Sequence, residues 1–207
     1  MKQAKSAAKR PATGKKLSAV SGAPGEVRII SGSWRGRKLA VLDAEGLRPT
    51  TDRVKETLFN WLMHDIAGAT VLDCFAGSGS LGFEALSRYA SHCTLLERDK
   101  AAANQLMANQ RKLACTNAEV IHTDSLQWLA KPALCRYDVV FIDPPFRKNL
   151  AVPCCQQLEQ QQWLTDNALI YLETEKELDV AALPANWRLL KDKVAGQLAY
   201  RLYQRTS

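Results

Sequence analysis

From residue 70 onward, short apolar runs alternate with amphipathic segments, and this alternation is the feature that most restricts the fold. The apolar runs lie at 70–75, 93–97, 118–122, 137–142 and 168–173. Strands that alternate with helices predict right-handed crossovers and a parallel sheet covered on both faces. Two later β-like runs, 187–194 and 197–205, flank an Ala-Gly turn and predict an antiparallel hairpin. We therefore expect an α/β chain whose seven-stranded sheet is mostly parallel and ends in that hairpin.

Basic charge is concentrated at the N-terminal end of the chain. Residues 1–56 hold 13 of the 28 Lys and Arg residues but only 5 of the 21 Asp and Glu residues. A basic segment on a neutral body is typical of an arm that contacts a polyanion, and a solubilising tail is the alternative. We predict a disordered basic tail over 1–25, a small N-terminal hairpin and helix over 26–66, and the α/β domain over 67–207.

The predicted N-terminal extension contains a hairpin with a basic tip. Two β-prone runs, 27–30 and 38–42, flank a turn rich in Gly, Ser and Arg. Arg35, Arg37 and Lys38 lie at or near that turn. Helix-start residues at 49–52, followed by an apolar residue every four positions up to residue 66, predict one amphipathic helix.

Composition restricts the compartment. No apolar run approaches the roughly 18 residues of a membrane span. The first 25 residues lack the apolar core of a secretory signal, although their makeup overlaps with organelle transit peptides. Six cysteines, at 74, 93, 115, 135, 154 and 155, form no C-x-x-C pair, which predicts buried thiols in a reducing compartment and no metal site. We expect a cytoplasmic protein without membrane contact, and a monomer because no additional apolar stripe is evident.

A glycine-rich turn follows the first strand of the predicted sheet. Gly77, Gly79 and Gly82 form a G-x-G-x-x-G motif between strand and helix, and Glu97 ends the next strand. This is the dinucleotide-type arrangement, in which the acid binds ribose hydroxyls. Asp73 ends the first strand, where its charge would repel a diphosphate but favour a cationic group such as the ammonium of S-adenosylmethionine.

Two more acids follow later strands. Asp124 could accept from an adenine amine or cap the helix that follows. Asp143 begins the sequence DPPF, whose two prolines remove backbone N–H donors and leave carbonyl acceptors. The Asp143 carboxylate and the Pro144 carbonyl therefore lie beside the flat apolar face of Phe146. Such a site suits a planar group that bears an NH2.

Together these motifs resemble a Rossmann-like class I S-adenosylmethionine-dependent methyltransferase, and DPPF resembles the signature of enzymes that methylate exocyclic base amines. The sequences RIISGSWRGRKL, LRPTTDRVKETLFNWL, VLDCFAGSGSLGFEALSRYA and DVVFIDPPF resemble the RsmD family, the bacterial 16S rRNA (guanine(966)-N(2))-methyltransferases. The resemblance covers residues 26–204. It implies that 26–66 is an extension that contacts RNA or the cofactor, and that 67–207 is the catalytic domain. It also implies that S-adenosylmethionine is converted to S-adenosylhomocysteine without a metal, and that the partner is 16S rRNA in an assembled or assembling small subunit.

The resemblance also implies three groups of site residues. The cofactor's methionine part would lie at Asp73, Gly77 and Gly79, its ribose at Glu97 and its adenine at Asp124 and Ser125, with Phe75 in the same loop. The target guanine would be held by Asp143, Pro144, Pro145 and Phe146. RNA phosphates would be bound by Arg35, Arg37, Lys38, Arg48, Arg53, Arg147 and Lys148. For Arg48 and Arg53, helix-surface charge or an ion pair with Asp52 or Glu56 is the alternative.

Three other functions remain possible. A DNA adenine or cytosine amino-methyltransferase also uses DPPF chemistry, but it needs a region that reads the grooves, for which we expect no room after the catalytic domain. A Rossmann oxidoreductase is disfavoured by Asp73 and by DPPF. A non-catalytic RNA-binding module is disfavoured because DPPF and the glycine loop are both intact.

Overall fold

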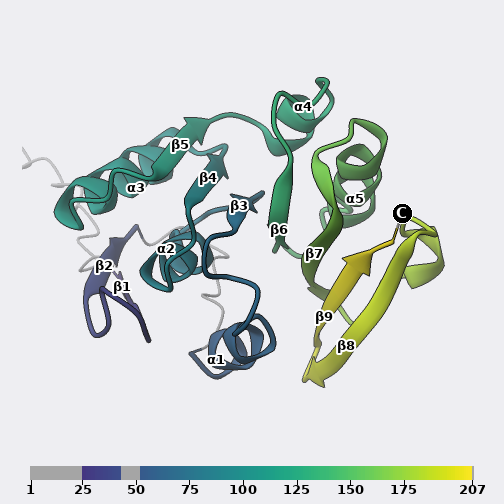
Figure 1. The fold of residues 1–207 in the computed structure, drawn as a ribbon, viewed down its shortest axis with the longest axis horizontal. Coiled ribbons are helices and arrows are strands. Elements are labelled where there is room, and N and C mark those ends of the chain that lie inside the picture. Colours follow the sequence, from purple (N-terminus) through teal and green to yellow (C-terminus); the bar gives the residue numbers. More distant parts are fainter. Residues whose placement is uncertain (1–24, 43–51, 207) are drawn as a thin grey trace, which may run out of the picture.

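The computed structural model describes residues 25–42 and 52–206 of the chain (Figure 1). The predicted tail lies outside these residues except for Gly25, which begins a strand rather than ending the tail. Arg48 also lies outside them. No helix in the described ranges is both long and apolar enough to cross a membrane.

The elements follow one another in an order close to the predicted one. They are β1 (Gly25–Arg28), β2 (Lys38–Val41), α1 (Asp52–Trp61), β3 (Thr70–Asp73), α2 (Ser80–Ser87), β4 (His92–Glu97), α3 (Lys100–Lys112), β5 (Ala118–His122), α4 (Ser125–Leu129), β6 (Tyr137–Ile142), α5 (Ala151–Gln160), β7 (Leu164–Glu175), the 3₁₀ turn Val180–Ala182, β8 (Trp187–Ala195) and β9 (Leu198–Arg205).

The main sheet has the strand order β5-β4-β3-β6-β7-β9-β8. Neighbours from β5 to β7 are parallel, whereas β9 pairs antiparallel with both β7 and β8. This arrangement confirms the predicted α/β fold with its C-terminal hairpin. From β3 the chain builds outward through β4 and β5 and then returns to β6 on the other side of β3. Open parallel sheets bind ligands at such a switch point, beyond the carboxyl ends of the strands.

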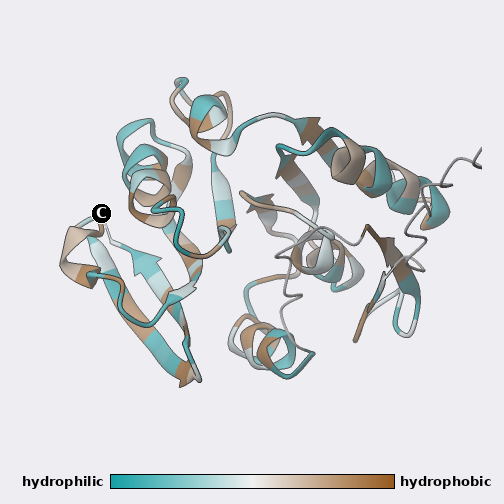
Figure 2. Cartoon of the chain, turned by 180° about the vertical axis from the view of Figure 1, so that it is seen from behind, coloured by the Kyte–Doolittle hydropathy of each residue, from teal (hydrophilic) through white to brown (hydrophobic). Residues whose placement is uncertain are grey.

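Each face of the sheet carries its own apolar cluster. Val71 and Val139 belong to the cluster that also takes in side chains of α1, α2 and α3, whereas their neighbours Leu72 and Val140 belong to the cluster with α4 and α5. Strands covered on both faces read as continuous apolar runs, and the central strands in Figure 2 are accordingly hydrophobic. The prediction of buried thiols is wrong for Cys135, which lies on an exposed connection, and correct for the other five cysteines.

The N-terminal hairpin forms as predicted and lies against α2 and α3 (Figure 1). The backbone N–H of Ser33 donates to the carbonyl of Ser87 at the end of α2, over 2.8 Å. Gly32 has a φ of +80°, and a Cβ there would lie 1.8 Å from the same carbonyl oxygen. Only glycine therefore allows the hairpin to approach α2 this closely.

A buried carboxylate in α2 holds the hairpin in place. Glu84 is fully buried and accepts hydrogen bonds from the backbone N–H groups of Ile30, at 2.7 Å, and Ser31, at 3.1 Å. Arg88, one turn later in α2, donates its Nε to Glu84 over 2.8 Å. The Lys55 ammonium lies 4.0 Å from the same carboxylate. The charge of Glu84 is thus balanced by two cations and two backbone donors.

Lys55 extends this network to α1 and β1. Its ammonium is fully buried and donates to the Arg28 carbonyl over 2.6 Å and to the Ser80 hydroxyl over 3.2 Å. Burial lowers the pKa of Lys55, while the nearby Glu84 charge opposes that shift. Because Ser80 is the first residue of α2, Lys55 joins α1 to the helix that follows the glycine loop.

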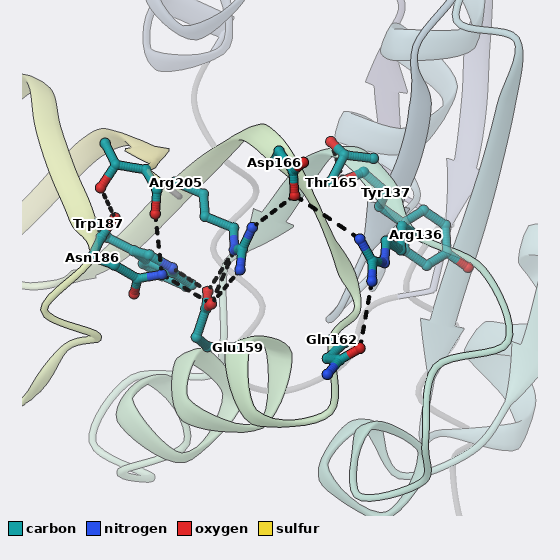
Figure 3. A network of polar contacts seen from close by, with 10 residues as sticks. Arg136, Tyr137, Glu159, Gln162, Thr165, Asp166, Asn186, Trp187 and Arg205 are labelled. Carbon is teal, nitrogen blue, oxygen red and sulfur yellow. Dashed lines mark hydrogen bonds and ion pairs between the residues drawn. The ribbon is translucent and has the colours of Figure 1, made fainter.

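A second network of hydrogen bonds and ion pairs joins the C-terminal hairpin to α5 (Figure 3). Glu159 accepts from Arg205 at 2.8 Å, from Asn186 at 2.9 Å and from Trp187 at 3.0 Å. Arg205 also lies 3.3 Å from Asp166 of β7. Burial alone would raise the pKa of Glu159, but these hydrogen bonds lower it below its usual value.

Removing the Glu84 carboxylate should destabilise the fold strongly. Glu84→Ala leaves Lys55 and Arg88 without their buried counter-charge, a loss of about 3–5 kcal/mol in the free energy of unfolding. Urea denaturation measures this loss in the free energy of unfolding. Glu26→Ala is the control because Glu26 pairs with Lys38 at an exposed site, and this change should leave the midpoint unaltered within error. Equal effects of the two changes would contradict the assigned role of Glu84.

Candidate active site

Two acids flank the switch point of the sheet. Asp73 is the last residue of β3, and Asp143 directly follows β6. The two strands are neighbours in parallel register, with Asp73 opposite Phe141. The predicted acids at the ends of β3, β4, β5 and β6 therefore gather along one edge of the sheet.

Asp73 is almost completely buried, with 2% of its surface exposed. Its Oδ2 accepts from the backbone N–H of Gly82 over 3.1 Å, and the backbone N–H of Phe75 also donates to it. Burial raises the pKa of Asp73 to about 7, and the charge of Glu97 adds to that rise. A buried carboxylate with only backbone donors is a site that a cation would stabilise.

Glu97 fixes the glycine loop to the end of β4. Its Oε2 accepts from the backbone N–H of Gly77 at 2.8 Å, and its Oε1 accepts from that of Asp99 at 2.7 Å. A carboxylate oxygen can accept more than one hydrogen bond, so these contacts orient Glu97 and leave acceptor capacity for ribose hydroxyls.

The glycines of the loop are required for different physical reasons. Gly77 and Gly79 have φ values of +51° and +75°, which favour glycine. A Cβ on Gly79 would lie 2.6 Å from carbons of Leu106 and Phe83. The sequence predicts that these glycines let the backbone approach a ligand, whereas at Gly79 the structure shows that packing against α3 also requires a glycine.

Asp124 and Ser125 already have partners within the protein. Asp124 caps α4, accepting from the backbone N–H of Gln127 over 3.1 Å, as the alternative interpretation expects. The buried hydroxyl of Ser125 donates to the carbonyl of Cys74. Ser125 thus joins the start of α4 to the end of β3, and contact of either residue with adenine stays a prediction.

The DPPF sequence forms the connection between β6 and α5. Asp143 is half-buried and Pro144 is buried, whereas Pro145 is exposed. Phe146 is 41% exposed. The acceptor end of the sequence is therefore anchored to the sheet, and its aromatic ring faces outward, where a flat ligand could stack on it.

Five of the seven predicted RNA-binding residues fall into two groups. Arg147 and Lys148 are exposed directly after DPPF. The hairpin residues Arg35, Arg37 and Lys38 are also exposed but lie beside α2 and α3.

Some of these cations already have partners. Arg37 donates to the carbonyl of Lys112 over 3.1 Å, and Lys38 pairs with Glu26 at 2.7 Å. Arg53 is exposed on α1, while its neighbour Asp52 lies 3.8 Å from Lys55. Phosphate binding by the two groups stays a prediction.

Sequence inspection did not single out Lys55, Glu84 or Glu173. Glu84 is the one acid in α2, all of whose residues are buried. Lys55 falls on the helix face that includes Leu58 and Phe59. A charge on an apolar face signals a buried partner, because an unpaired buried charge is strongly unfavourable. Within the described residues, no group of three or more His, Cys, Asp or Glu side chains is placed to hold a metal ion.

Comparison with known proteins decides the family. The family described as Conserved hypothetical protein 95 matches residues 27–204. Ribosomal RNA small subunit methyltransferase D of Escherichia coli (strain K12) is 55% identical over 181 residues, covering 87% of this chain and 91% of that protein. The chain belongs to the RsmD family.

A second relative and a solved structure agree with the RsmD assignment. Ribosomal RNA small subunit methyltransferase D of Haemophilus influenzae is 58% identical over 185 residues, covering 88% of this chain and 95% of that protein. The structure titled putative methyltransferase yhhF from Escherichia coli superposes with a TM-score of 0.82 at 54% identity, covering 88% and 99% of the two chains. The predicted Rossmann-like methyltransferase fold is thereby confirmed.

The packing at Gly79 makes a testable prediction. Gly79→Ala and Gly36→Ala both introduce a Cβ at a positive φ, but Gly36 has open space around it. We expect Gly79→Ala to lower the free energy of unfolding by about 1–3 kcal/mol more than Gly36→Ala, because Leu106 and Phe83 must move. Thermal unfolding of both variants provides the comparison. Equal losses would show that backbone strain alone accounts for Gly79.

Proposed function

We propose that this RsmD-family chain is an rRNA methyltransferase that transfers a methyl group from S-adenosylmethionine to the exocyclic 2-amino group of a guanine, of the position 966 type, in 16S rRNA. The observation that carries the proposal is the placement of Asp73 at the end of β3 and of Asp143 directly after the adjacent strand β6, at the switch point. One carboxylate suits a cationic cofactor and the other suits a base amine. The names of the relatives from Escherichia coli and Haemophilus influenzae support an rRNA substrate.

The residues at the carboxyl edge fit S-adenosylmethionine. Asp73 offers a buried negative charge for the cofactor's ammonium, and Glu97 is held in position to accept from ribose hydroxyls. Asp124 is only partly buried and lies just after β5. This strand is next to β4, so the adenine would lie at Asp124 when the ribose lies at Glu97. When bound, the cofactor supplies an electrophilic methyl group and its own leaving group.

The residues after β6 activate the target amine by orienting it. The lone pair of guanine N2 is delocalised into the ring, so the free amine is a poor nucleophile. Acceptance of its two hydrogens by the Asp143 carboxylate and the Pro144 carbonyl favours the pyramidal form. On methylation, N2 would lose one of these protons to the Asp143 carboxylate or to water. Alignment of the reacting atoms about 3–3.5 Å apart accounts for much of the rate.

The surroundings of the site fit an RNA substrate. The ring of Phe146 would stack on a base that has left its stack, and Arg147 with Lys148 would bind the adjoining phosphates. The hairpin cations Arg35 and Arg37 would contact RNA farther from the target. We propose the extension over 26–66 as this RNA-contacting unit, and a monomer acting in the cytoplasm on an assembled or assembling small subunit.

Methyl transfer to three substrates tests this function. Labelled S-adenosylmethionine is offered with small ribosomal subunits, naked 16S rRNA or duplex DNA, and the modified nucleoside is identified by mass. We expect N2-methylguanosine on rRNA or subunits. Label on adenine or cytosine in DNA would instead support the DNA amino-methyltransferase, and RNA binding without transfer would support the non-catalytic module.

The same assay tests the role of Asp143. Asp143→Asn should lower kcat by about 10²-fold, since one oriented polar group at a reacting centre contributes on this scale. The dissociation constant for the cofactor should change little. Glu119→Gln, which alters a carboxylate exposed on β5, is the control. Equal losses in kcat and cofactor affinity would contradict the assignment of Asp143 to the target amine.

Burial of Asp73 predicts a pH dependence of cofactor binding. Its raised pKa of about 7 means that the cofactor-free protein holds a proton there at pH 6 and loses it by pH 8. Because the ionised form binds the ammonium, the affinity advantage of the wild type over Asp73→Asn should grow from pH 6 to pH 8. The ratio of the two dissociation constants removes the titration of the cofactor's own amine. A ratio that stays constant over this range would contradict the contact.

A further inference from the structure

A second acid, Glu173, lies on β7, the neighbour of the strand that Asp143 follows. In the parallel pair of β6 and β7, Ile142 lies opposite Leu172, and Asp143 and Glu173 directly follow this pair on their strands. Glu173 is 4% exposed. Glu173 has no role in the proposed methyl transfer.

A hydrogen bond from Tyr171 orients this carboxylate. The Tyr171 hydroxyl donates to Glu173 Oε2 over 2.6 Å. Burial raises the pKa of Tyr171, and the charges of Glu173 and Asp143 raise it further. Tyr171 therefore lies within electrostatic reach of both carboxylates, which places all three groups in one corner of the site.

The surroundings of Glu173 contrast with those of the structural acids. No ion pair to Glu173 occurs within residues 25–42 and 52–206, whereas Glu84 and Glu159 each contact an arginine. Burial raises the pKa of Glu173, and the Tyr171 hydroxyl opposes this rise. A buried acid with one hydroxyl donor is unfavourable for stability alone, and a ligand that brings a donor would offset that cost.

Aromatic side chains lie around Tyr171 and Glu173. Tyr200 of β9 lies opposite Glu173 in the sheet and stacks on Trp61 of α1, with ring centroids 5.6 Å apart. Phe141 meets Tyr171 edge to face at 6.3 Å. These rings surround the Tyr171–Glu173 pair with apolar surface. In such surroundings a hydrogen bond to a base discriminates strongly between the correct base and other bases.

We propose that Glu173 is the residue that selects guanine, by accepting the N1–H of the base while Asp143 and the Pro144 carbonyl accept the hydrogens of its 2-amino group. The proposal rests on the function proposed above and deepens it. In guanine, N1–H lies next to the 2-amino group, so two neighbouring acceptors can accept hydrogen bonds from both donors. Adenine and cytosine carry a lone pair at the ring nitrogen beside their amine, and a carboxylate would repel it. Tyr171 is the positioning residue for this contact.

One base analogue tests the contact. 2,6-Diaminopurine keeps the 2-amino group but has a lone pair at N1 in place of N1–H and an amine in place of O6. Small-subunit RNA with either guanine or diaminopurine at the target position is compared by kcat/KM for methyl transfer. The wild type should prefer guanine by about 10²-fold, because the wrong base leaves a carboxylate facing a lone pair.

Glu173→Gln should change this preference. The Tyr171 hydroxyl would hold the amide oxygen, leaving the amide NH2 free to donate to N1 of diaminopurine. We expect kcat/KM for guanine to fall by about 10-fold or more and the guanine-to-diaminopurine ratio to approach or pass unity. Tyr171→Phe should lower the ratio in part, since the carboxylate loses its orientation. Glu175→Gln, on the same strand, is the control and should keep the wild-type ratio.

Each outcome bears on the inference. A wild type that methylates both bases equally would overturn it without any variant. A Glu173→Gln protein that loses activity but keeps the wild-type ratio would show a structural role only, and would overturn it as well. Failure of the function itself is distinguishable, because the wild type would then form no N2-methylguanosine from the guanine substrate.

Discussion

The fold depends on the buried negative charge of Glu84. An isolated carboxylate inside a protein is strongly unfavourable, so α2 can exist in this position only if other elements supply donors and positive charge. The hairpin loop supplies the N–H groups of Ile30 and Ser31, α1 supplies Lys55, and α2 itself supplies Arg88. The N-terminal segment is therefore part of the structure that carries the glycine loop, and not an appendage to it.

Among the described residues, three buried acids and the half-buried Glu159 divide into two kinds by their partners. Glu84 and Glu159 contact cations of the protein itself and join distant elements. Within residues 25–42 and 52–206, Asp73 and Glu173 receive only backbone or hydroxyl donors, and both lie at the carboxyl edge of the sheet. An edge that holds uncompensated negative charge favours ligands that bring a cation or N–H donors, which is the chemistry of the proposed cofactor and target base.

Sequence periodicity predicted the sheet, its hairpin, the glycine loop and the acids at the strand ends, because each depends on neighbours in the chain. It could not identify partners such as Glu84 and Ile30, which are 54 positions apart. It also predicted that Cys135 is buried, and it did not identify the protein partners of Arg37 and Lys38, since exposure and ion pairs depend on tertiary packing. Glu173 appears in sequence as the polar end of an apolar strand, and only the sheet register brings it beside Asp143.

Helix α2 joins two regions with different proposed partners. Its first turn follows the glycine loop, and its last residue, Ser87, receives the hairpin that carries Arg35 and Arg37. Eight residues at about 1.5 Å each make a rod of about 12 Å that cannot change length while its hydrogen bonds persist. In the proposed function, the length of α2 therefore sets the distance between the methyl group of the cofactor and the RNA that Arg35 and Arg37 would contact.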